Sequence, residues 1–321
     1  MSNKEIKQKK VKASSLYGDY IVMLIAPVVL AALFYGSRTF AVIAVSILSA
    51  VFSDLIFSAI LKKNFLLKDL SNIFIGAAIA LMMPAGVPLY VPASACSFAV
   101  VTAKIPFGGS LRAPFVPAAA GFAFASVWFK EQSFDYSYNS ADKLLGARSL
   151  GALLAQGNAV YLDTINTFDI ISGNVAGPMG TGCGLLMIAS LVFLAFRRKD
   201  ALFATGGFIA ACALFAALLP RVNADAFTSV VLELSAGSLL FVAVFLVTDY
   251  ATLPQKKLTR FVYGAVCGIF CMLMRTVGTY EETACFAVLL ANGFSPVIDS
   301  VVQKLPAADK AVSSERKEAQ K

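Results

Sequence analysis

Ionisable side chains within or beside long apolar segments are the residues of this sequence best placed to do chemistry. Asp54 and Glu233 each fall well inside an apolar stretch, with serines at positions 53, 58, 235 and 238 around them. Burying a charge in lipid is costly, so such a carboxylate by default indicates function. Carboxylate and hydroxyl oxygens suit a hard cation such as Na⁺. We predict a cation path through Asp54 and Glu233; the same groups could relay protons, or simply be hydrogen-bonded to a neighbouring helix.

Six cysteines also lie in or at the ends of apolar segments, at positions 96, 183, 212, 267, 271 and 285. The chain has no histidine and no C-x-x-C pair. A zinc site or a four-thiolate iron–sulfur cluster therefore lacks its usual local ligand set. Cys267 and Cys271 share a helix face in a helical segment, but buried apolar thiols explain them better than a half-site that another subunit completes.

The composition places all these residues in a membrane. Of 321 residues, 58% are hydrophobic and 14% charged, and the mean hydropathy is +0.76, which excludes an ordinary soluble domain. A span needs roughly 20 mainly apolar residues, and by that measure the chain offers about ten. We predict an all-α, polytopic integral membrane protein with about ten transmembrane helices. The expected spans are 20–35, 39–61, 71–83, 87–102, 114–129, 182–196, 201–219, 226–247, 261–274 and 283–297.

The lysines and arginines predict how the chain is oriented. Five lysines before residue 13 place the N-terminus inside, and every second crossing returns to a basic cluster, near residues 62–68, 104–112, 197–199 and 256–260. The net charge of +8 then suits anionic lipid rather than nucleic acid. We expect a bacterial cytoplasmic (inner) membrane protein with a cytoplasmic segment at 1–19, a transmembrane domain at 20–300 and a charged cytoplasmic tail at 301–321.

Residues 130–180 are the longest polar stretch and are expected to form an extracytoplasmic lobe. A connection of this length is either functional or disordered. Its aromatic residues could stack on a flavin ring or form an interfacial belt. These aromatic residues are Phe134, Tyr136, Tyr138, Tyr161 and Phe168.

The spans divide into two halves of five. Because each half crosses the membrane an odd number of times, the second half would have the opposite orientation to the first. The halves are therefore candidates for a five-plus-five inverted repeat, although they share little sequence. In such folds the sites lie at the repeat interface near the midplane.

Ordered motifs along nearly the whole chain carry a family resemblance. They are TDYATLP at 248–254, MRTVGTYEE at 274–282, FAVLLAN at 286–292, LMMP at 81–84 and KIPFGG at 104–109. Together they resemble the RnfD protein of Rnf-type complexes and its relative NqrB, a membrane protein of the sodium-pumping NADH:quinone oxidoreductase.

The resemblance implies a membrane subunit that couples flavin-mediated electron transfer to Na⁺ or H⁺ translocation. It implies FMN and riboflavin as cofactors, and partner subunits that carry flavin, iron–sulfur clusters and the nicotinamide or ferredoxin site. This chain itself has no Gly-x-Gly-x-x-Gly after a strand. The residues it assigns to cofactor binding are Lys104, Gly108, Gly109, Asp142, Thr181, Asp249 and Arg275.

Three departures concern the ligand side of the family pattern. Asp142 stands at the position of the threonine whose hydroxyl carries FMN, Thr181 stands where the family has a glutamate, and APFVPA at 113–118 replaces Asn-Pro-Phe-Asn-Pro-Ala. We therefore predict a divergent member without covalently bound flavin. Two alternatives remain: a ten-helix small-solute transporter or channel without redox activity, and a structural anchor for other subunits.

The resemblance and the expected orientation also locate the 274–282 motif. Arg275 and Glu281 should lie at the outer ends of the ninth and tenth spans, and therefore close to the lobe at 130–180. Arg275 could there pair with an anion such as a flavin phosphate, or with Glu281.

Overall fold

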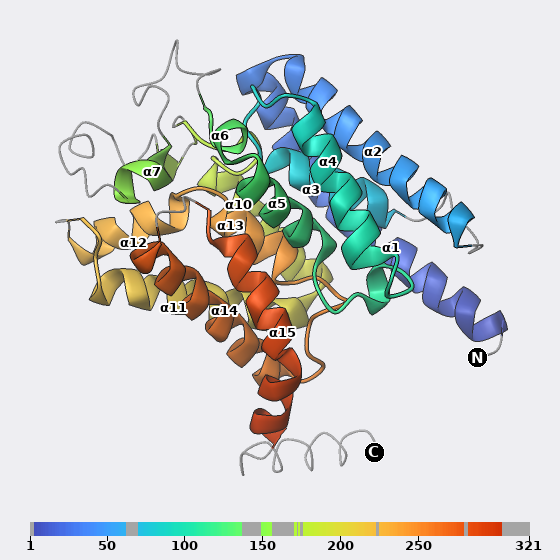
Figure 1. The fold of residues 1–321 in the computed structure, drawn as a ribbon. Coiled ribbons are helices and arrows are strands. Elements are labelled where there is room, and N and C mark those ends of the chain that lie inside the picture. Colours follow the sequence, from blue (N-terminus) through green and yellow to red (C-terminus); the bar gives the residue numbers. More distant parts are fainter. Residues whose placement is uncertain are drawn as a thin grey trace.

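The computed structural model describes a helical protein. It covers residues 3–61, 70–136, 149–155, 170–171, 173, 176–222, 225–278 and 282–303, with the side chains of residues 3–16 left out. Every regular element in these ranges is a helix and none is a strand (Figure 1). Asp142, Glu281, Tyr138, Tyr161, Phe168 and the expected tail from residue 304 lie outside the described residues.

Each expected apolar segment contains helix. In the first half these are α1 (Asn3–Tyr35), α2 (Arg38–Ile60), α3 (Ser71–Leu81), α4 (Tyr90–Phe98) continued by the π-helical turn η1 (Ala99–Lys104), and α5 (Pro117–Trp128). In the second half they are α10 (Gly184–Arg197), α11 (Leu202–Leu218), α12 (Ala226–Ser235), α13 (Leu239–Phe241) continued by η5 (Val242–Leu246), α14 (Lys257–Val277) and α15 (Ala284–Gln303). Shorter pieces are η2 (Ser110–Arg112), α6 (Lys130–Ser133), α7 (Leu150–Ala155) and η4 (Lys199–Ala201).

The lengths of these helices identify a multi-pass membrane protein. Five helices are long and apolar enough to cross a bilayer, or six if α12 and α13 with η5 form one span bent by 73°. The helices α3, α5 and α10 are apolar but shorter. Ten crossings therefore stay a prediction. Residues 3–19, expected as a separate N-terminal segment, continue into the first span as one helix.

Helix α3 is short because another segment forms hydrogen bonds with the backbone at its C-terminal end. Pro84 has no backbone N–H and cannot continue the helix. The backbone N–H groups of Met179 and Gly180 donate to the carbonyls of Met83 (3.1 Å) and Leu81 (2.9 Å). Gly180 permits this approach, since a Cβ there would lie 2.5 Å from the Leu81 side chain. The end of the lobe segment thus docks inside the helical body.

The two halves pack in the same order. In the first, α2 lies against α3 and α4, and α4 lies against α5; in the second, α11 lies against α12 and α14, and α14 lies against α15. The most extensive pair, α11 with α14, is close because Gly207, Gly264 and Gly268 place backbone against backbone. The contact between α5 and α15 joins the halves.

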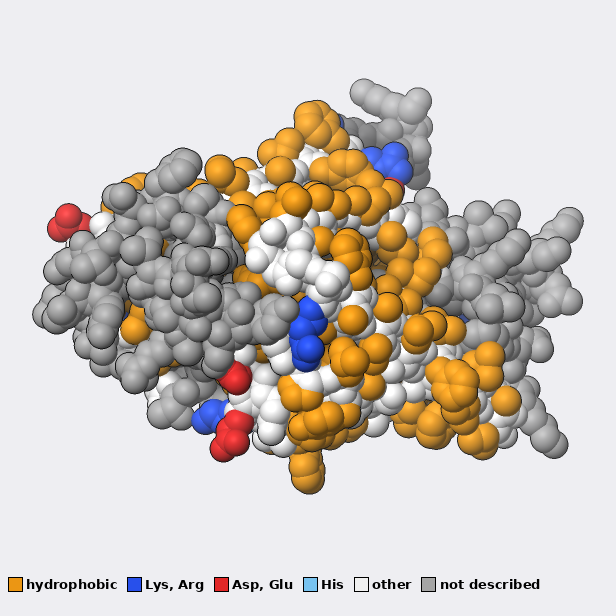
Figure 2. All heavy atoms as spheres, turned by 90° about the horizontal axis from the view of Figure 1, so that it is seen from above, with side chains coloured by type: hydrophobic (Ala, Val, Ile, Leu, Met, Phe, Trp, Pro, Cys, Tyr) orange, Lys and Arg blue, Asp and Glu red, His pale blue; other side chains and the backbone are white. Residues whose placement is uncertain are grey.

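Large apolar side chains cover the outside of the helical body. Leu33, Phe52, Phe196 and Phe227 are each at least 65% exposed. Figure 2 shows one face on which hydrophobic side chains dominate and charged groups are few. This is the surface a bilayer accepts, because lipid tails are as apolar as these side chains.

Candidate functional site

The first buried polar cluster joins Asp54 of α2, Asn72 of α3 and Lys104 at the end of η1. The Lys104 ammonium lies 3.0 Å from Asp54 Oδ2 and donates to Asn72 Oδ1 at 2.5 Å. Asn72 Nδ2 donates to the same Asp54 oxygen at 2.7 Å, and Ser58 Oγ donates to the other at 3.3 Å. All four residues are at most 8% exposed. The Asp54 carboxylate is therefore neutralised by one cation and hydrogen-bonded through both oxygens. We call this set the lysine cluster.

The backbone around Lys104 explains how its side chain reaches the interior. Ile105 N bonds to Val100 O, the five-residue spacing of a π-helical turn, which rotates the side chains that follow. Gly108 and Gly109 then turn the chain back with φ of +84° and +114°, values that favour glycine. The predicted cofactor residues Lys104, Gly108 and Gly109 are thus neighbours, but the Lys104 ammonium is engaged by Asp54.

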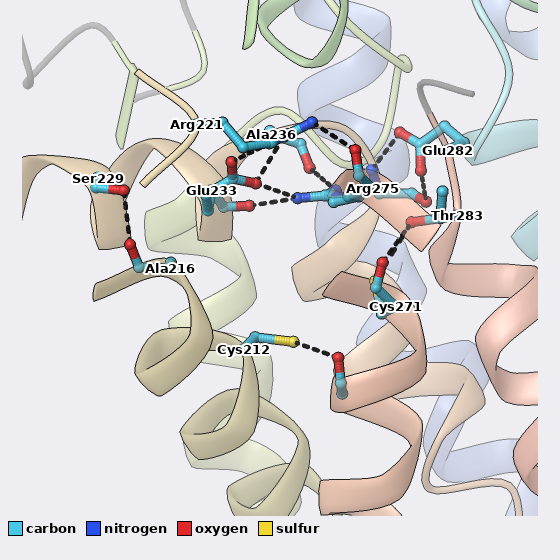
Figure 3. Close-up of polar contacts among 12 residues, drawn as sticks. Cys212, Ala216, Arg221, Ser229, Glu233, Ala236, Cys271, Arg275, Glu282 and Thr283 are labelled. Carbon is cyan, nitrogen blue, oxygen red and sulfur yellow. Dashed lines mark hydrogen bonds and ion pairs between the residues drawn. The ribbon is translucent and has the colours of Figure 1, made fainter. Parts of the chain in front are cut away.

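The second cluster surrounds Glu233 of α12 (Figure 3). Arg221, in the loop after α11, donates to Glu233 Oε1 (2.5 Å) and Oε2 (2.8 Å), and Arg275 Nη1 donates to Oε2 at 3.1 Å. Glu233 and Arg275 are each 2% exposed. One carboxylate is thus held by two guanidinium groups, and Arg221 binds it in the paired geometry that arginine and carboxylate favour. We call this set the arginine cluster.

Arg275 also stabilises the break between α12 and α13. Its Nη1 and Nη2 atoms donate to the carbonyl oxygens of Glu233 (2.7 Å) and Ala236 (2.9 Å). A cation at a helix C-terminus satisfies orphan carbonyls and the helix dipole together. On the other side of the break, the Glu282 carboxylate accepts hydrogen bonds from Ser238 N and Ser238 Oγ, both at 2.6 Å.

Asp249 occupies a third site, shortly after η5. It is 1% exposed, and Ala251 N donates to its Oδ1 at 3.1 Å. Burial raises the pKa of Asp249 to about 6, although the Ala251 N–H and the Arg198 charge pull the pKa down. Arg198 lies over the rings of Tyr20 and Tyr250, at 5.3 and 5.4 Å from their centroids.

Polar atoms without a partner lie along the chain that follows Asp249 and in α15. Within the described residues, Thr259 Oγ1 and Asn292 Nδ2 are buried and make no hydrogen bond, and Thr252 Oγ1, which lies near the Tyr263 hydroxyl, makes none with regular geometry. Asn292 Oδ1 accepts from Tyr263 Oη at 2.5 Å. Buried polar atoms are nearly always satisfied, so these indicate a place for water or a ligand.

The structure brings the predicted site residues together in pairs rather than in one site. Asp54 meets Lys104, Glu233 meets Arg275, and Asp249 stands apart from both. Thr181 is buried in the docked lobe segment, and its hydroxyl is without a partner among the described residues. Asp142 lies outside the described residues. No described group of three or more Cys, Asp or Glu side chains could hold a metal ion.

Sequence reasoning missed Arg221, Asn72 and Glu282. Arg221 lies in a short connection that reads as an ordinary outward turn, yet its side chain enters the membrane domain. Asn72 follows Ser71 at the start of the third apolar segment. A polar side chain at the second position of a span was the signal that could have identified it.

The six cysteines are free thiols, and all but Cys183 are buried. Cys285 Sγ lies 3.8 Å from the Met82 sulfur, and Cys271 Sγ lies 3.5 Å from Thr283 Oγ1. These contacts are those of small core residues.

Comparison with known proteins gives the chain a family. Residues 2–307 match the model of the NQR2, RnfD, RnfE family, and the chain belongs to it. It is 24% identical over 291 residues to the D component of the Na⁺-translocating ferredoxin:NAD⁺ oxidoreductase complex of Acetobacterium woodii, covering 90% of this chain and 89% of that protein. It is 26% identical to the D component of the ion-translocating oxidoreductase complex of Salmonella arizonae (83% and 86% covered). It is 29% identical to the B component of the Na⁺-translocating NADH-quinone reductase of Neisseria meningitidis serogroup B (70% and 57% covered).

Proposed function

We propose that the chain, as a member of the NQR2, RnfD, RnfE family, is a membrane subunit of an ion-translocating electron-transport complex. The match over residues 2–307 carries this proposal, because it spans the helical body and all three polar sites. The complex would couple flavin-mediated electron transfer to the movement of Na⁺ or H⁺. Other subunits, with flavin or iron–sulfur clusters, would supply the remaining redox steps in a bacterial inner membrane, with both termini of this chain cytoplasmic.

The lysine cluster supports a role for Asp54 in cation movement. Its carboxylate already holds one positive charge, the Lys104 ammonium, at 3.0 Å. A mobile cation that binds Asp54 would compete with that ammonium for the same carboxylate oxygens, so binding would favour withdrawal of Lys104. Lysine is a compact charge on a flexible stem and is suited to such an exchange. Asp54 and Lys104 would thus alternate between an internal and an external counter-ion.

Ten spans in two inverted halves fit this function. The packing order of α2 to α5 recurs in α11 to α15, and each half ends its fourth segment with a buried cation. Lys104 ends η1 and Arg275 lies in the last turn of α14. An odd number of spans per half places these two cations toward opposite sides of the membrane. The lysine and arginine clusters would then be repeat-related.

The residues around Asp249 fit a flavin ring better than a metal ion. Thr252 Oγ1 and Asn292 Nδ2 are unsatisfied buried groups. The threonine hydroxyl can donate or accept a hydrogen bond and the asparagine amide nitrogen can donate one, which would match the N–H and C=O groups at the edge of a flavin ring. Riboflavin or FMN bound there would supply one- and two-electron transfer. Asp249, Thr252 and Asn292 would bind and orient it. Because Asp142 lacks an acceptor hydroxyl, we propose that no flavin is covalently attached.

The flavin proposal has a direct test. Purified native protein should show a flavin absorbance band, and denatured protein should show no fluorescent band on a gel. A fluorescent band after denaturation would place the attachment at another hydroxyl, such as Thr181. Replacing Asp142-Lys143 by Thr-Pro should create the band in a host with the attaching enzyme.

The cation proposal is tested with Asp54→Asn in the whole complex, reconstituted in vesicles. The change keeps the shape and removes the charge, so electron transfer should continue while cation uptake falls at least about tenfold, the effect of about 1.4 kcal/mol. Asp200→Asn is the matched control, because Asp200 is an exposed carboxylate whose nearest cation, Arg260, lies 3.7 Å away. Unchanged uptake in the Asp54→Asn complex would assign that carboxylate a structural role.

The bent span α12 to η5 favours one second candidate, a small-solute transporter or channel. Broken helices of this kind form substrate sites in secondary transporters. A colourless preparation that transports a solute in vesicles without electron donors would support this function and oppose the first.

A further inference from the structure

Glu282 is a buried carboxyl group that neither the ion pairs nor the cofactor residues above use. It lies between α14 and α15, is 1% exposed, and accepts hydrogen bonds only from Ser238 among the described residues. Asp54 and Glu233 each have a cation within 3.1 Å, whereas no described cation forms an ion pair with Glu282. Its charge is therefore balanced only at longer range.

The break between α12 and α13 is shaped around this carboxyl group. Gly237 adopts φ of +63°, and a Cβ at this position would overlap Glu282 Oε1. Only a glycine therefore lets the carboxyl group approach the backbone so closely. Figure 3 shows Arg275 between Glu233 and Glu282. The break thus has a cation, Arg275, at one end and an anion, Glu282, at the other.

A small cavity lies against the break. It has a water-accessible volume of about 10 Å³, room for about one water molecule, and Ser235 and Gly237 line it together with Leu150, Ile170 and the segment around Pro178. Gly237 therefore contacts both the cavity and the carboxyl group of Glu282. Thr181 Oγ1 and Arg275 Nε are buried without a partner in the described chain, and water would satisfy them.

We propose that Glu282 is a proton-binding site at the helix break, in exchange with water that enters from the lobe side. On release, the carboxyl O–H bond breaks and the proton passes to water in the cavity; on uptake, the reverse occurs. The groups around Glu282 are N–H and O–H donors rather than the several oxygens that a hard cation needs. The ligand is therefore a proton and not Na⁺.

Ser238 can serve both protonation states. Its hydroxyl donates to the ionised carboxylate and can rotate to accept from the protonated acid, while the Ser238 N–H donates in either state. The break would thus keep its shape as the proton comes and goes. Burial raises the pKa of Glu282, and Arg275 and the Ser238 donors oppose that rise. Cys271 and Cys285 also interact electrostatically with Glu282, whereas Arg221 and Glu233 contact Arg275.

Infrared difference spectra of the purified full-length chain test the proposal. Wild-type protein should show the carbonyl band of a protonated carboxylic acid that disappears at a pH above the usual range of glutamate. Because the pKa of Asp249 is also raised, the spectra are taken in an Asp249→Asn background. There Glu282→Gln should remove this band, because the amide reproduces the hydrogen bonds of the protonated acid without titrating. Asp200→Asn, which removes an exposed carboxylate, should leave it intact. The same band and midpoint in Glu282→Gln would overturn the proposal.

A second variant covers the case in which Glu282→Gln fails to fold. Ser238→Ala removes a donor to the ionised form, so the midpoint should rise by about one pH unit. An unchanged midpoint would also contradict the proposal. Because these spectra need neither partner subunits nor electron transfer, their outcome is separate from that of the proposed function.

Discussion

The lysine cluster and the arginine cluster differ in how they neutralise a buried carboxylate. Both neutralise a carboxylate buried among membrane helices, but Asp54 is held by one ammonium and an amide, whereas Glu233 is held by two guanidinium groups. Arg275 is also bonded to the carbonyls of Glu233 and Ala236. An ammonium is a point charge that can leave, whereas a bonded guanidinium network holds its geometry. The comparison leads us to propose that the lysine cluster is the exchangeable one and the arginine cluster the fixed one.

Loss of Arg275 should have the largest effect on stability. Arg275→Met removes one of the two cations on Glu233 and leaves two backbone carbonyls without a donor, so unfolding should become easier by about 3–5 kcal/mol. Thermal unfolding in detergent measures this. Arg197→Met is the control, since Arg197 pairs with Asp19 at the surface and such pairs contribute about 0–1 kcal/mol. Similar losses in both variants would refute a fixed role for the arginine cluster.

Lys104→Met should destabilise the protein by about 3 kcal/mol, because Asp54 is then a buried charge without its cation. Adding Asp54→Asn should recover most of this loss, since the remaining groups are neutral and can bond to Asn72. The double-mutant cycle, measured by thermal unfolding, gives the coupling energy. If the two changes were additive, the ion pair at 3.0 Å would not be a unit.

Asp249 extends the comparison to a buried carboxylate that no described cation pairs with. Its pKa is raised from 3.8 to about 6, so in this range the folded protein holds a proton that the unfolded chain has released. Stability should therefore fall by about 2 kcal/mol as pH rises from about 4 to about 6 and stay level above that. Asp249→Asn should flatten this part of the curve of unfolding temperature against pH. An unaltered curve would mean that other groups carry the dependence.

A substitution in the helix packing near the arginine cluster should have the smallest effect on stability. Gly264 lies on the same helix as Arg275, and a Cβ there would overlap the carbonyl oxygen of Ala204. Gly264→Ala should cost about 1–2 kcal/mol by forcing α11 and α14 apart. Gly206→Ala is the matched control, because nothing lies within 4 Å of its added Cβ and alanine favours a helix. Equal effects on the unfolding temperature would show that this close approach is unimportant.

Much of the helical organisation followed from local sequence. Runs of apolar residues gave the positions of the helices, because every backbone group in lipid must bond within its own segment. Proline and glycine gave several ends, such as the end of α3 before Pro84. The shortness of α3 and the bend of 73° after α12 did not follow, since both depend on segments distant in the chain.

The candidate sites show the same division. The sequence identified Asp54 and Glu233 as costly charges in apolar segments, and the family resemblance pointed to Lys104 and Arg275. Asp54 and Lys104 are 50 residues apart, and Glu233 and Arg275 are 42 apart. Nothing local indicates which carboxylate meets which cation. Arg221 illustrates the limit, because its place in a short connection gave no reason to expect it against Glu233.

The sequence by itself determined the membrane environment, the helical class, the family and some of the buried charges, because each of these depends on composition, spacing or motif order. The tertiary structure decided how those charges combine. Two π-helical turns, a glycine at φ of +63° and the close approach of α11 to α14 set side-chain directions that no residue pattern encodes. Electrostatic energy in a membrane domain depends on distances of a few ångströms, and only the packed helices fix them.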